Sequence, residues 1–459
     1  MADLPFLTDT ATATVPIHAM RSGEWRDWIE RHAENLRRLA AAHDFQAQNG
    51  RILLVPATDG SIERVLFGVG DKANVTAMGA LAQHLPSGDF RIAAAPREFS
   101  ATAVAIAWGL GAYGFDRYKK RKRAAPRLAP PDGADMGEAA RIVRGSWLAR
   151  DLVNTPTNDM GPDALHAAAE TVARAHGAKF EAIVGDDLLT QNYPLIHAVG
   201  RAAQQAPRLL HLSWGDTSAP RLAIVGKGVC FDTGGLDIKP SAGMRFMKKD
   251  MGGAAHALAL AQIVMEAKLN VRLELFLPVV ENSIAGDAFR PGDVIPSRKG
   301  PTVEIDNTDA EGRLILADAL ARACEDSPAL LLDYATLTGA ARTALGPDLP
   351  PFFSNDDALA AEFTQASVDT SDPIWRMPLW DAYEGDMDSG IADLKNTGDG
   401  AFAGAIYAAL FLRRFVTVSA WAHFDIFAWA PKEKPSRPAG GEAQALRASW
   451  AVIKKRFAA

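Results

Sequence analysis

The stretch "RLAIVGKGV", residues 221–229, is typical of a buried strand, and the chain around it repeats an alternation of strand and helix. "GGAAHALALAQIVMEA" (252–267) predicts a helix whose start packs closely through small residues, and "RLELFLPVV" (272–280) predicts a second strand. "RLILADALARACED" (313–326) and "ALLLDYATLTG" (329–339) add another helix and another strand. Strands that alternate with helices predict an α/β sheet covered on both faces. Ligands of such sheets lie beyond the carboxyl ends of the strands.

A chain of 459 residues is too long for one ordinary domain. The first third contains strand-like runs, "GRILLVPA" (50–57) and "RVLFGVG" (64–70), and the helix-like "ATAVAIAWGLGAYGF" (101–115). A basic cluster followed by Pro, Ala and Gly then marks a composition shift near residues 117–137. We therefore expect a small N-terminal α/β domain (1–125), a linker with a connecting helix (126–149), and a larger C-terminal domain with a central mixed sheet flanked by helices (150–459).

Composition excludes several classes of protein. Hydrophobic residues make up 48% and charged residues 23%, as in ordinary soluble globular proteins. The formal net charge of -6 points neither to nucleic acid nor to anionic membrane. Two cysteines, Cys230 and Cys324, both in apolar surroundings, fit a reducing compartment rather than a disulfide scaffold or a cysteine zinc site. With no signal-peptide pattern and no long apolar run, we expect a cytoplasmic protein without membrane contacts.

Several well-known catalytic and binding motifs are absent. There is no His-Glu-x-x-His, and the ten histidines show no metal-ligand spacing. "VGKGVC" (225–230) lacks the first Gly and the Ser or Thr of a phosphate loop, and "DNTDAEG" (306–312) lacks oxygen donors that an EF-hand loop needs. No Gly-x-Ser-x-Gly elbow occurs. A histidine zincin, a P-loop protein, an EF-hand and an α/β-hydrolase are therefore disfavoured.

What remains is a set of carboxylates and basic residues near the predicted strand ends. Its members are Lys227, Asp232, Lys239, Asp250, Asp309, Glu311 and Arg313. Each alone is weak evidence, since a lone Asp before a helix is more often an N-cap than a ligand. The neighbouring pair Lys248 and Lys249 is most simply interpreted as a solvated face.

The combination of acids favours a metal centre. Four carboxylates at the ends of one sheet repel one another in a low-dielectric site, and divalent cations would neutralise them. Oxygen ligands suit Mg²⁺ or Mn²⁺, and Zn²⁺ also accepts carboxylates. Two metals would need bridging carboxylates and a separation of roughly 3.5–4 Å. Such a centre lowers the pKa of a bridging water, while nearby lysine and arginine stabilise a developing oxyanion.

The longer motifs resemble a known family. "NTDAEGRL" (307–314) closely resembles the signature of the leucyl aminopeptidases, peptidase family M17, and "VGKGVCFDTGGLDIKPSAGMRFMKKDMGGAA" (225–255) resembles the family's other metal-binding block with its spacing intact. Four further blocks match in order: "ARDLVNTP" (149–156), "ATLTGA" (335–340), "SGIADLKN" (389–396) and "WAHFDI" (421–426). The resemblance covers most of residues 145–459, whereas the amino-terminal third carries no block as sharp.

The resemblance implies a ligand set for two divalent metal ions, Mn²⁺ or Zn²⁺ and potentially Mg²⁺. The tighter metal would be surrounded by Lys227, Asp232, Asp250 and Glu311. The looser metal would be held by Asp232, Asp309 and Glu311, so that Asp232 and Glu311 bridge. Lys227 as a ligand must be the neutral amine, which demands a strongly depressed pKa. Residues 150–459 would then form the catalytic dimetal aminopeptidase domain.

The resemblance also implies catalytic roles for two cations. Lys239 would contact the substrate carbonyl oxygen and stabilise the tetrahedral intermediate. Arg313 would hold a bicarbonate ion that acts as general base. Asp309 and Glu311 would point to the metals, with Gly312 permitting a tight turn ahead of the apolar helix. Asp318, inside that helix, is expected to have a structural role.

The reaction implied by the resemblance is removal of the N-terminal residue from short peptides with a free α-amine. The first side chain would lie near Met247 and near Thr336, Leu337 and Gly339 of the "TLTG" segment, although Met247 could equally be plain core. An apolar pocket of this kind favours Leu or Met with broad tolerance, since a methylene is worth only about 1–3 kcal/mol. Phe427 either narrows this pocket or, as we expect, packs inward. A homohexamer with active sites facing an internal cavity is also implied.

Two alternatives stay open. Some members of the family act as architectural DNA-binding proteins, and the basic run Arg117 to Arg123 would support that role here, although such a run is more often a solvated linker. A two-metal phosphoesterase needs similar carboxylates but usually adds histidine ligands, which are absent from these motifs. The sequence therefore favours the aminopeptidase.

Overall fold

The computed structural model describes residues 4–8, 13–121 and 123–458. The chain divides into two compact units, Met1–Trp147 with Pro431–Ala439, and Leu148–Ala430 with Gly440–Ala459. The boundary therefore falls inside one helix, α5 (Met136–Asn154). The domain limits that we expected from composition, at residues 125 and 149, differ from this boundary and stay a prediction.

The first unit is a five-stranded mixed sheet with helices on both faces. Its strand order is β2-β3-β1-β4-β5, in which β2 alone runs antiparallel to its neighbour. The strands are β1 (Val15–Met20), β2 (Ile52–Pro56), β3 (Ile62–Gly68), β4 (Asp89–Ala94) and β5 (Arg127–Leu128). Strands over 52–56 and 62–68 and the helix α4 (Ala101–Gly111) confirm the predicted elements. The stretch expected to be a linker contributes β5.

Alternate residues of these strands face two separate cores. Met20, Leu53 and Leu66 pack with α1 (Ser22–Glu30) and α2 (Glu34–Ala42). Ala19 and Phe67 belong to the second core, whose helical members come from η1 (Val75–Met78), α3 (Gly79–His84), α4 and α5. Because successive side chains of a strand point to opposite faces, one sheet supplies both cores.

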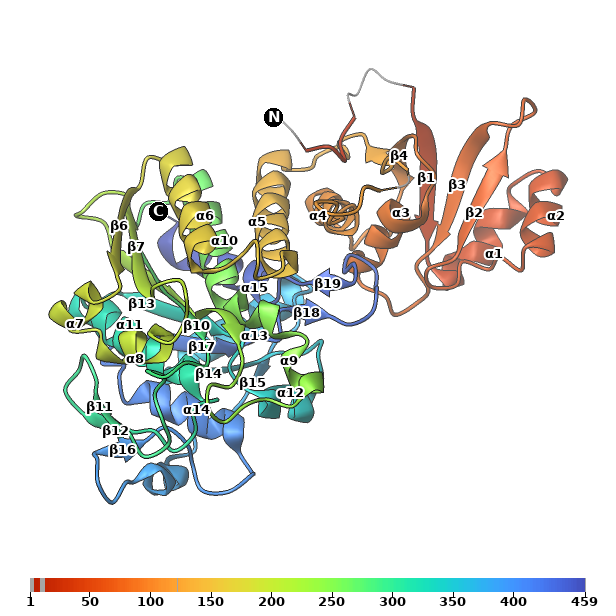
Figure 1. Ribbon diagram of the computed structural model, residues 1–459. Coiled ribbons are helices and arrows are strands. Elements are labelled where there is room, and N and C mark those ends of the chain that lie inside the picture. The colour runs from red at the N-terminus through yellow and green to blue at the C-terminus, as the bar shows by residue number, and fades with distance from the viewer. Residues whose placement is uncertain (1–3, 9–12, 122, 459) are drawn as a thin grey trace. The chain divides into compact units, whose positions relative to one another are not determined.

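The second unit is built on a larger mixed sheet, as the sequence predicts (Figure 1). Its order is β15-β14-β17-β13-β8-β10-β7-β6, and β9 also pairs with β10. The central strands β17, β13, β8 and β10 are parallel, whereas β14, β7 and β6 each pair antiparallel with a neighbour. The strands are β6 (Lys179–Val184), β7 (Arg208–Trp214), β8 (Arg221–Gly226), β9 (Gly228–Asp232), β10 (Arg272–Asn282), β13 (Leu330–Ala335), β14 (Pro351–Ser354), β15 (Trp375–Arg376) and β17 (Trp421–Asp425).

Helices cover both faces of this sheet, which confirms the predicted α/β architecture. One face packs Ala223, Val225 and Leu331 against α8, α11 and α14, while α10 lies against β8, β10 and β13 on the other. The helices are α6 (Pro162–Ala175), α7 (Asp187–Thr190), α8 (Pro194–Gly200), α9 (Ser241–Met244), η2 (Met247–Met251), α10 (Gly252–Glu266), α11 (Glu311–Glu325), α12 (Gly339–Leu345), α13 (Asp357–Asp369), η3 (Asp381–Met387), α14 (Gly404–Arg413) and α15 (Leu446–Phe457).

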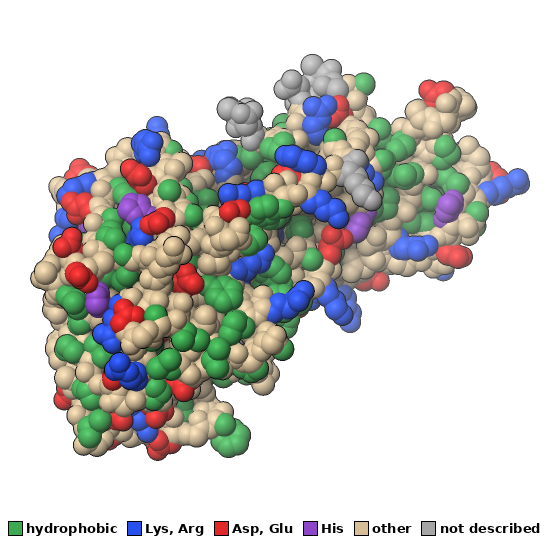
Figure 2. Space-filling view, in the orientation of Figure 1, with side chains coloured by type: hydrophobic (Ala, Val, Ile, Leu, Met, Phe, Trp, Pro, Cys, Tyr) green, Lys and Arg blue, Asp and Glu red, His purple; other side chains and the backbone are tan. Residues whose placement is uncertain are grey.

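Short strands complete the second unit away from the main sheet. They are β11 (Val294–Pro296), β12 (Thr302–Glu304) and β16 (Leu394–Lys395) in one small sheet, and β18 (Trp429–Ala430) with β19 (Gly440–Gly441) in another. Acidic and basic side chains are interspersed over the larger unit on the face drawn in Figure 2. Among the described residues, no helix combines the length and the apolar character needed to cross a bilayer.

Small residues bring α10 unusually close to the sheet. A Cβ added to Gly253 would lie 2.2 Å from the carbonyl oxygen of Tyr334, and one added to Gly226 would lie 2.7 Å from Cα of Ala254. Any larger side chain would force helix and sheet apart. The small residues predicted at the start of this helix therefore set its distance from β8 and β13.

The buried carboxylate of Asp318 ties α11 to its surroundings. It accepts hydrogen bonds from the backbone N–H groups of Leu195 (2.8 Å), Ile196 (3.3 Å) and Arg298 (2.8 Å). Leu195 and Ile196 lie in the first turn of α8, where N–H groups have no partner within the helix. Burial raises the pKa of Asp318 to about 7, against the effect of these donors. The expected structural role agrees with these contacts.

Candidate active site

A cavity of about 500 Å³ lies in the second unit, beyond the carboxyl ends of the parallel strands. Lys227 follows β8, Asp232 ends β9, Thr336 follows β13, and Asp425 ends β17. Most of the sequence-predicted site residues line it: Lys227, Asp232, Lys239, Met247, Asp250, Asp309, Glu311, Thr336, Leu337 and Gly339. Arg313 is the predicted residue that the lining does not include.

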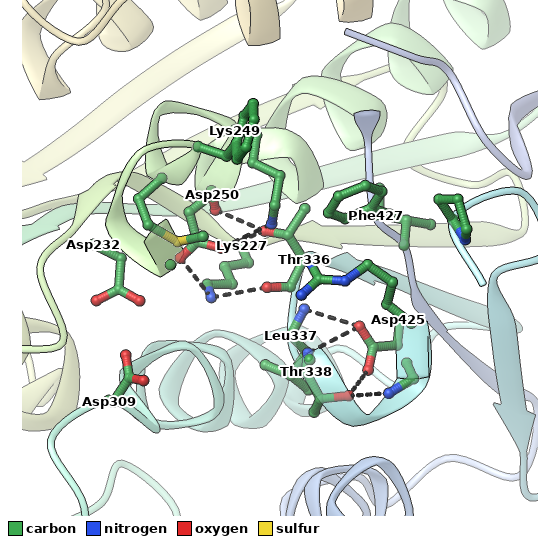
Figure 3. Close-up of a pocket in the computed structure, with 18 of the residues that line it drawn as sticks. Lys227, Asp232, Lys249, Asp250, Asp309, Thr336, Leu337, Thr338, Asp425 and Phe427 are labelled. Atoms are coloured by element: carbon green, nitrogen blue, oxygen red, sulfur yellow. Dashed lines mark hydrogen bonds and ion pairs between the residues drawn. The ribbon is translucent and has the colours of Figure 1, made fainter. Parts of the chain in front are cut away.

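Four carboxylates and two lysines form one wall of the cavity. Ligand oxygens of Asp232, Asp309 and Glu311 lie within 4.8 Å of one another. Lys227 Nζ lies 2.8 Å from both Asp250 Oδ2 and Glu311 Oε1. Figure 3 shows the carboxylates of Asp232 and Asp309 pointing toward each other.

The second lysine of this wall is Lys239. Its Nζ lies 2.8 Å from Asp232 Oδ2 and also contacts Asp309. Burial alone would lower the pKa of Lys239, but the charges of Asp232, Glu311 and Asp309 outweigh that effect and raise it. The acids therefore hold this side chain as an ammonium at the edge of the cluster.

Two of the acids have pKa values well above their ordinary range. Burial, reinforced by the charge of Asp232, raises the pKa of Glu311 to about 8 and that of Asp309 to about 6. Burial would lower the pKa of Lys227, but the carboxylates of Asp250, Glu311 and Asp232 outweigh it and raise the pKa. The wall thus carries more carboxylates than its two lysines can balance.

This donor set fits divalent cations. Asp250 Oδ2 and Glu311 Oε1 are buried, and the neighbour that they share among the described residues is Lys227 Nζ, 2.8 Å from each. Buried acceptors of this kind are normally satisfied by a donor or an ion. Carboxylate oxygens gathered around a small volume are ligands that Mg²⁺, Mn²⁺ and Zn²⁺ accept.

Lys227 is fixed from three sides. Its N–H donates to the carbonyl of Tyr334 (2.9 Å), and its carbonyl accepts from the N–H of Ala254 (2.7 Å). A Cβ on Gly312 would lie 2.5 Å from Lys227 Cε, so a larger residue would require the end of the lysine side chain to shift. We expected Gly312 to permit a tight turn, and that reason is wrong: α11 already begins at Glu311, and Gly312 has no left-handed backbone.

The turn that carries Asp309 is braced by Asn396. The Oδ1 of Asn396 accepts from the N–H groups of Asp306 (2.8 Å) and Asn307 (3.2 Å), and its Nδ2 donates to the carbonyl of Asn307 (2.8 Å). Thr308 Oγ1 donates to the carbonyl of Gly234 (2.6 Å). The "SGIADLKN" block thus acts on the acids through Asn396, a residue that our sequence analysis did not single out.

Asp232 and Asp250 are oriented by neutral neighbours. Asn282, at the end of β10, donates from Nδ2 to Asp232 Oδ1 (2.9 Å), and Thr336 donates from Oγ1 to Asp250 Oδ1 (2.8 Å). Asn282 was missed because nothing in its local sequence marks it. Its place at the carboxyl end of a predicted strand was the available signal.

Asp425 organises the loop after β13. Its Oδ1 accepts from the N–H groups of Leu337 (2.9 Å) and Thr338 (3.1 Å), and its Oδ2 accepts from Thr338 Oγ1 (2.6 Å), as Figure 3 shows. These bonds hold the "TLTG" segment against the cavity. The "WAHFDI" block contains Asp425, yet its partner lies 88 residues away in the chain, so the sequence did not reveal its role.

Arg313 lies beside the cavity rather than in its lining. The side chain is buried, and one terminal nitrogen donates to the carbonyl of Asn396 (2.6 Å). Its Nε has no hydrogen-bond partner among the described residues. Burial lowers the pKa of Arg313 to about 10, although the charges of Glu311 and Asp425 oppose the shift.

Two expectations about the rest of the cavity are wrong. Lys249 is only 5% exposed and lines the cavity, so it is not part of a solvated face. Lys248 is half-buried and donates to the carbonyl of Asn154 (2.6 Å). Phe427, expected to pack inward, lines the cavity instead. Short-range sequence could not reveal this, because these side chains meet only after β17 and η2 are brought together.

The chain matches sequence models of one family over both of its parts. Residues 147–449 match the catalytic domain of the cytosol aminopeptidase family, and residues 15–131 match the M17 aminopeptidase N-terminal domain. The chain belongs to the M17 cytosol aminopeptidase family. Members of this family are metallo-exopeptidases, so the chain is an aminopeptidase-type hydrolase. The second match extends the family assignment to the amino-terminal third, where our motifs were weakest.

Individual M17 relatives match nearly the whole chain. A probable cytosol aminopeptidase of Geobacter sp. (strain M21) is 38% identical over 454 residues, covering 92% of each chain. The crystal structure of the cytosol aminopeptidase from Coxiella burnetii is 44% identical, with a TM-score of 0.94, covering 98% of this chain and 99% of that one. The bottromycin maturation enzyme BotP in complex with Mn is 30% identical, with a TM-score of 0.87, covering 97% and 100%. These matches favour the M17 aminopeptidase over an architectural DNA-binding protein and a phosphoesterase.

Proposed function

We propose that the protein releases the N-terminal residue from short peptides with the help of two divalent metal ions. The observation that carries this proposal is the cluster of Asp232, Asp309 and Glu311, whose oxygens lie within 4.8 Å of one another in the cavity. Lys227 and Asp250 adjoin it.

The proposed ligands follow the M17 pattern. Lys227, Asp232, Asp250 and Glu311 would hold one ion, and Asp232, Asp309 and Glu311 the other. The charge of the first ion would oppose the carboxylates that raise the pKa of Lys227, and would favour its neutral amine as the ligand. When bound, the ions would polarise the peptide carbonyl and lower the pKa of a water. Mn²⁺ is supported by the Mn complex of the similar enzyme BotP, while Zn²⁺ and Mg²⁺ suit the same oxygens.

Lys239 and Arg313 have separate roles in this proposal. Lys239 carries a positive charge at the cavity edge, where it would stabilise negative charge that develops on the carbonyl oxygen. Arg313 would hold a bicarbonate ion that accepts a proton from the attacking water. The unpaired Nε of Arg313 supports this role, because it leaves a donor for an anion.

For specificity, we propose a broad enzyme that accepts Leu and Met at the first position. Met247 and Leu337 supply apolar surface, and Thr336 and Gly339 lie beside them in the lining. One methylene changes the transition-state free energy by only about 1–3 kcal/mol, so several side chains would be tolerated.

The M17 resemblance further supports a cytoplasmic homohexamer whose sites face an internal cavity. Light scattering on the purified protein would give the mass of six chains if this assembly forms. A mass equal to one chain at micromolar concentration would contradict it.

The proposed activity is tested on a panel of amino-acid p-nitroanilides and dipeptides. The protein would be assayed with Mn²⁺ or Zn²⁺, after EDTA, and as Glu311→Ala. N-acetylated substrates serve as the matched control, since they lack the free α-amine. We expect turnover that EDTA removes, that metal restores, and that Glu311→Ala and N-acetylation abolish. A folded protein without turnover under any metal would contradict the proposal.

A further inference from the structure

A second part of the cavity wall, adjoining the acid cluster at Asp250, carries two cations. Lys249 of η2 is 5% exposed, and its Nζ lies 5.3 Å from the ring centroid of Phe427. Arg342 of α12 is more exposed, and its Cζ lies 4.8 Å from the same centroid. All three residues line the cavity, so both cations border the part of it that Phe427 closes.

Lys249 has no hydrogen bond to the protein in the described part of the chain. The ion pair that it makes, with Asp250 Oδ1, has an N–O distance of 3.8 Å, which is too long for a hydrogen bond. Asp250 Oδ1 already accepts from Thr336 Oγ1. A buried amine with unused donors is costly unless a ligand satisfies it.

The remaining acid of this wall does not serve Lys249 either. Asp425 accepts three hydrogen bonds, all from the backbone and hydroxyl of Leu337 and Thr338. Its carboxylate is therefore directed at the loop after β13. Lys249 and Arg342 both line the cavity, where a ligand could meet their donors.

We propose that Lys249 is a specificity-determining residue whose donors bind a carboxylate at the end of the substrate's first side chain. The enzyme then accepts peptides that begin with Glu or Asp in addition to apolar residues, and Arg342 assists from the cavity rim. This inference rests on the proposed aminopeptidase activity.

The chemistry of the reaction places that side chain next to Lys249. The first side chain branches from the carbon bonded to the reacting carbonyl, which must lie at the acid cluster. Lys249 precedes the proposed metal ligand Asp250 in the chain, and Met247 lies two residues further back. Methylenes of Glu would contact the apolar lining while the carboxylate reaches the amine.

The test compares two substrates that lack a C-terminal carboxylate, Glu-p-nitroanilide and Leu-p-nitroanilide, in the Mn²⁺-loaded enzyme. In Lys249→Met we expect the ratio of kcat/KM values, Glu over Leu, to fall by about tenfold or more, while hydrolysis of the Leu substrate persists. Arg342→Met should lower the ratio less, and Lys249→Arg should retain part of it. Lys455→Met, an exposed lysine of α15, is the matched control and should leave the ratio unchanged.

Other results would overturn the inference. An unchanged ratio in Lys249→Met, or an equal loss for both substrates, would show that Lys249 does not select the first side chain. A loss confined to Leu-Gly, with Leu-Gly-amide unaffected, would mean that the cations bind the peptide's carboxyl terminus instead. Protection against thermal unfolding by L-glutamate relative to L-leucine gives a readout without turnover. Suppose that the wild-type protein hydrolyses no peptide, yet L-glutamate protects it against thermal unfolding and Lys249→Met removes that protection. This result would contradict the proposed function but would still support carboxylate binding by Lys249.

Discussion

Two walls of one cavity carry opposite excesses of charge. On one wall, four carboxylates surround Lys227 and Lys239, and burial, reinforced by the charge of Asp232, raises the pKa values of Asp309 and Glu311. On the other wall, Lys249 and Arg342 lie against Phe427, and the nearby acid Asp425 is engaged by a loop. The first arrangement suits cations, and the second suits an anion.

The two buried lysines show that partners, not burial, set the role of a charged side chain. Lys227 and Lys249 are both almost fully buried. Carboxylates raise the pKa of Lys227 against the effect of burial, whereas burial lowers the pKa of Lys249 because its single ion pair is long. Residues that look alike by exposure therefore belong to different sites.

The largest effect on the wall of four carboxylates, here called the acid wall, is expected from a substitution at Gly312. In Gly312→Ala the added Cβ would overlap Lys227 Cε and crowd Nζ, so the end of the lysine side chain must shift from its place between the acids. We expect kcat/KM to fall by about a hundredfold or more, because displacement of a positioned group by about 1 Å costs that much. Gly286→Ala is the control, since nothing lies within 4 Å of its added Cβ. Equal activity of Gly312→Ala and Gly286→Ala would show that the reaction does not depend on the position of the Lys227 side chain.

Replacement of Arg313 tests whether its buried guanidinium binds the bicarbonate ion proposed as general base. We expect Arg313→Met to lower kcat by about a hundredfold, within the usual contribution of a general base, and to abolish any response to added bicarbonate. Activity would be measured in buffers purged of CO₂ and then supplied with bicarbonate. A variant that still responds fully to bicarbonate would remove Arg313 from this role.

Asp318 provides a contrast outside the cavity. Asp318→Asn leaves N–H groups of Leu195, Ile196 and Arg298 with a weaker acceptor and sets an amide N–H against them. We expect the free energy of unfolding to fall by about 2 kcal/mol with kcat/KM of the folded enzyme unchanged. Urea unfolding followed by fluorescence would measure it. A stable protein with lost activity would instead tie Asp318 to the reaction.

The pH dependence of the free energy of unfolding, measured on the metal-free protein, tests the raised pKa of Glu311. Glu311 has a folded-state pKa of about 8, above its ordinary value, so the folded protein binds more protons than the unfolded chain between about pH 5 and 8. The free energy of unfolding should therefore decrease as pH rises through that window, by about 1 kcal/mol or more. Thermal unfolding after EDTA would measure it, with Glu311→Gln expected to flatten the slope. A wild-type slope of the opposite sign would contradict the imbalance on the acid wall.

Most of the fold followed from local pattern. The apolar runs at 221–229, 272–280 and 329–339 became central strands, and the small-residue start of α10 became the close contact with the sheet. The acids could be grouped because they lie in long motifs at strand ends, where an α/β sheet gathers its ligands.

What the sequence did not reveal depends on contacts between distant segments. Lys249 resembled a surface lysine because its neighbour is another lysine, and only the fold brings Phe427 beside it. Asn282, Asn396 and Asp425 act through hydrogen bonds to residues far away in the chain. Gly312 was assigned to a turn because glycine usually marks one, whereas here the space is needed for Lys227.

Metal counting tests the central claim most directly. Equilibrium dialysis against Mn²⁺ would be run on wild type, Glu311→Gln and Lys249→Met, with hydrolysis of Leu-p-nitroanilide measured on the same samples. We predict two Mn²⁺ per chain in wild type and in Lys249→Met, and weaker binding with loss of hydrolysis in Glu311→Gln. Hydrolysis by wild type from which all metal has been removed, or binding that Glu311→Gln leaves unchanged, would contradict a metal centre on the acid wall.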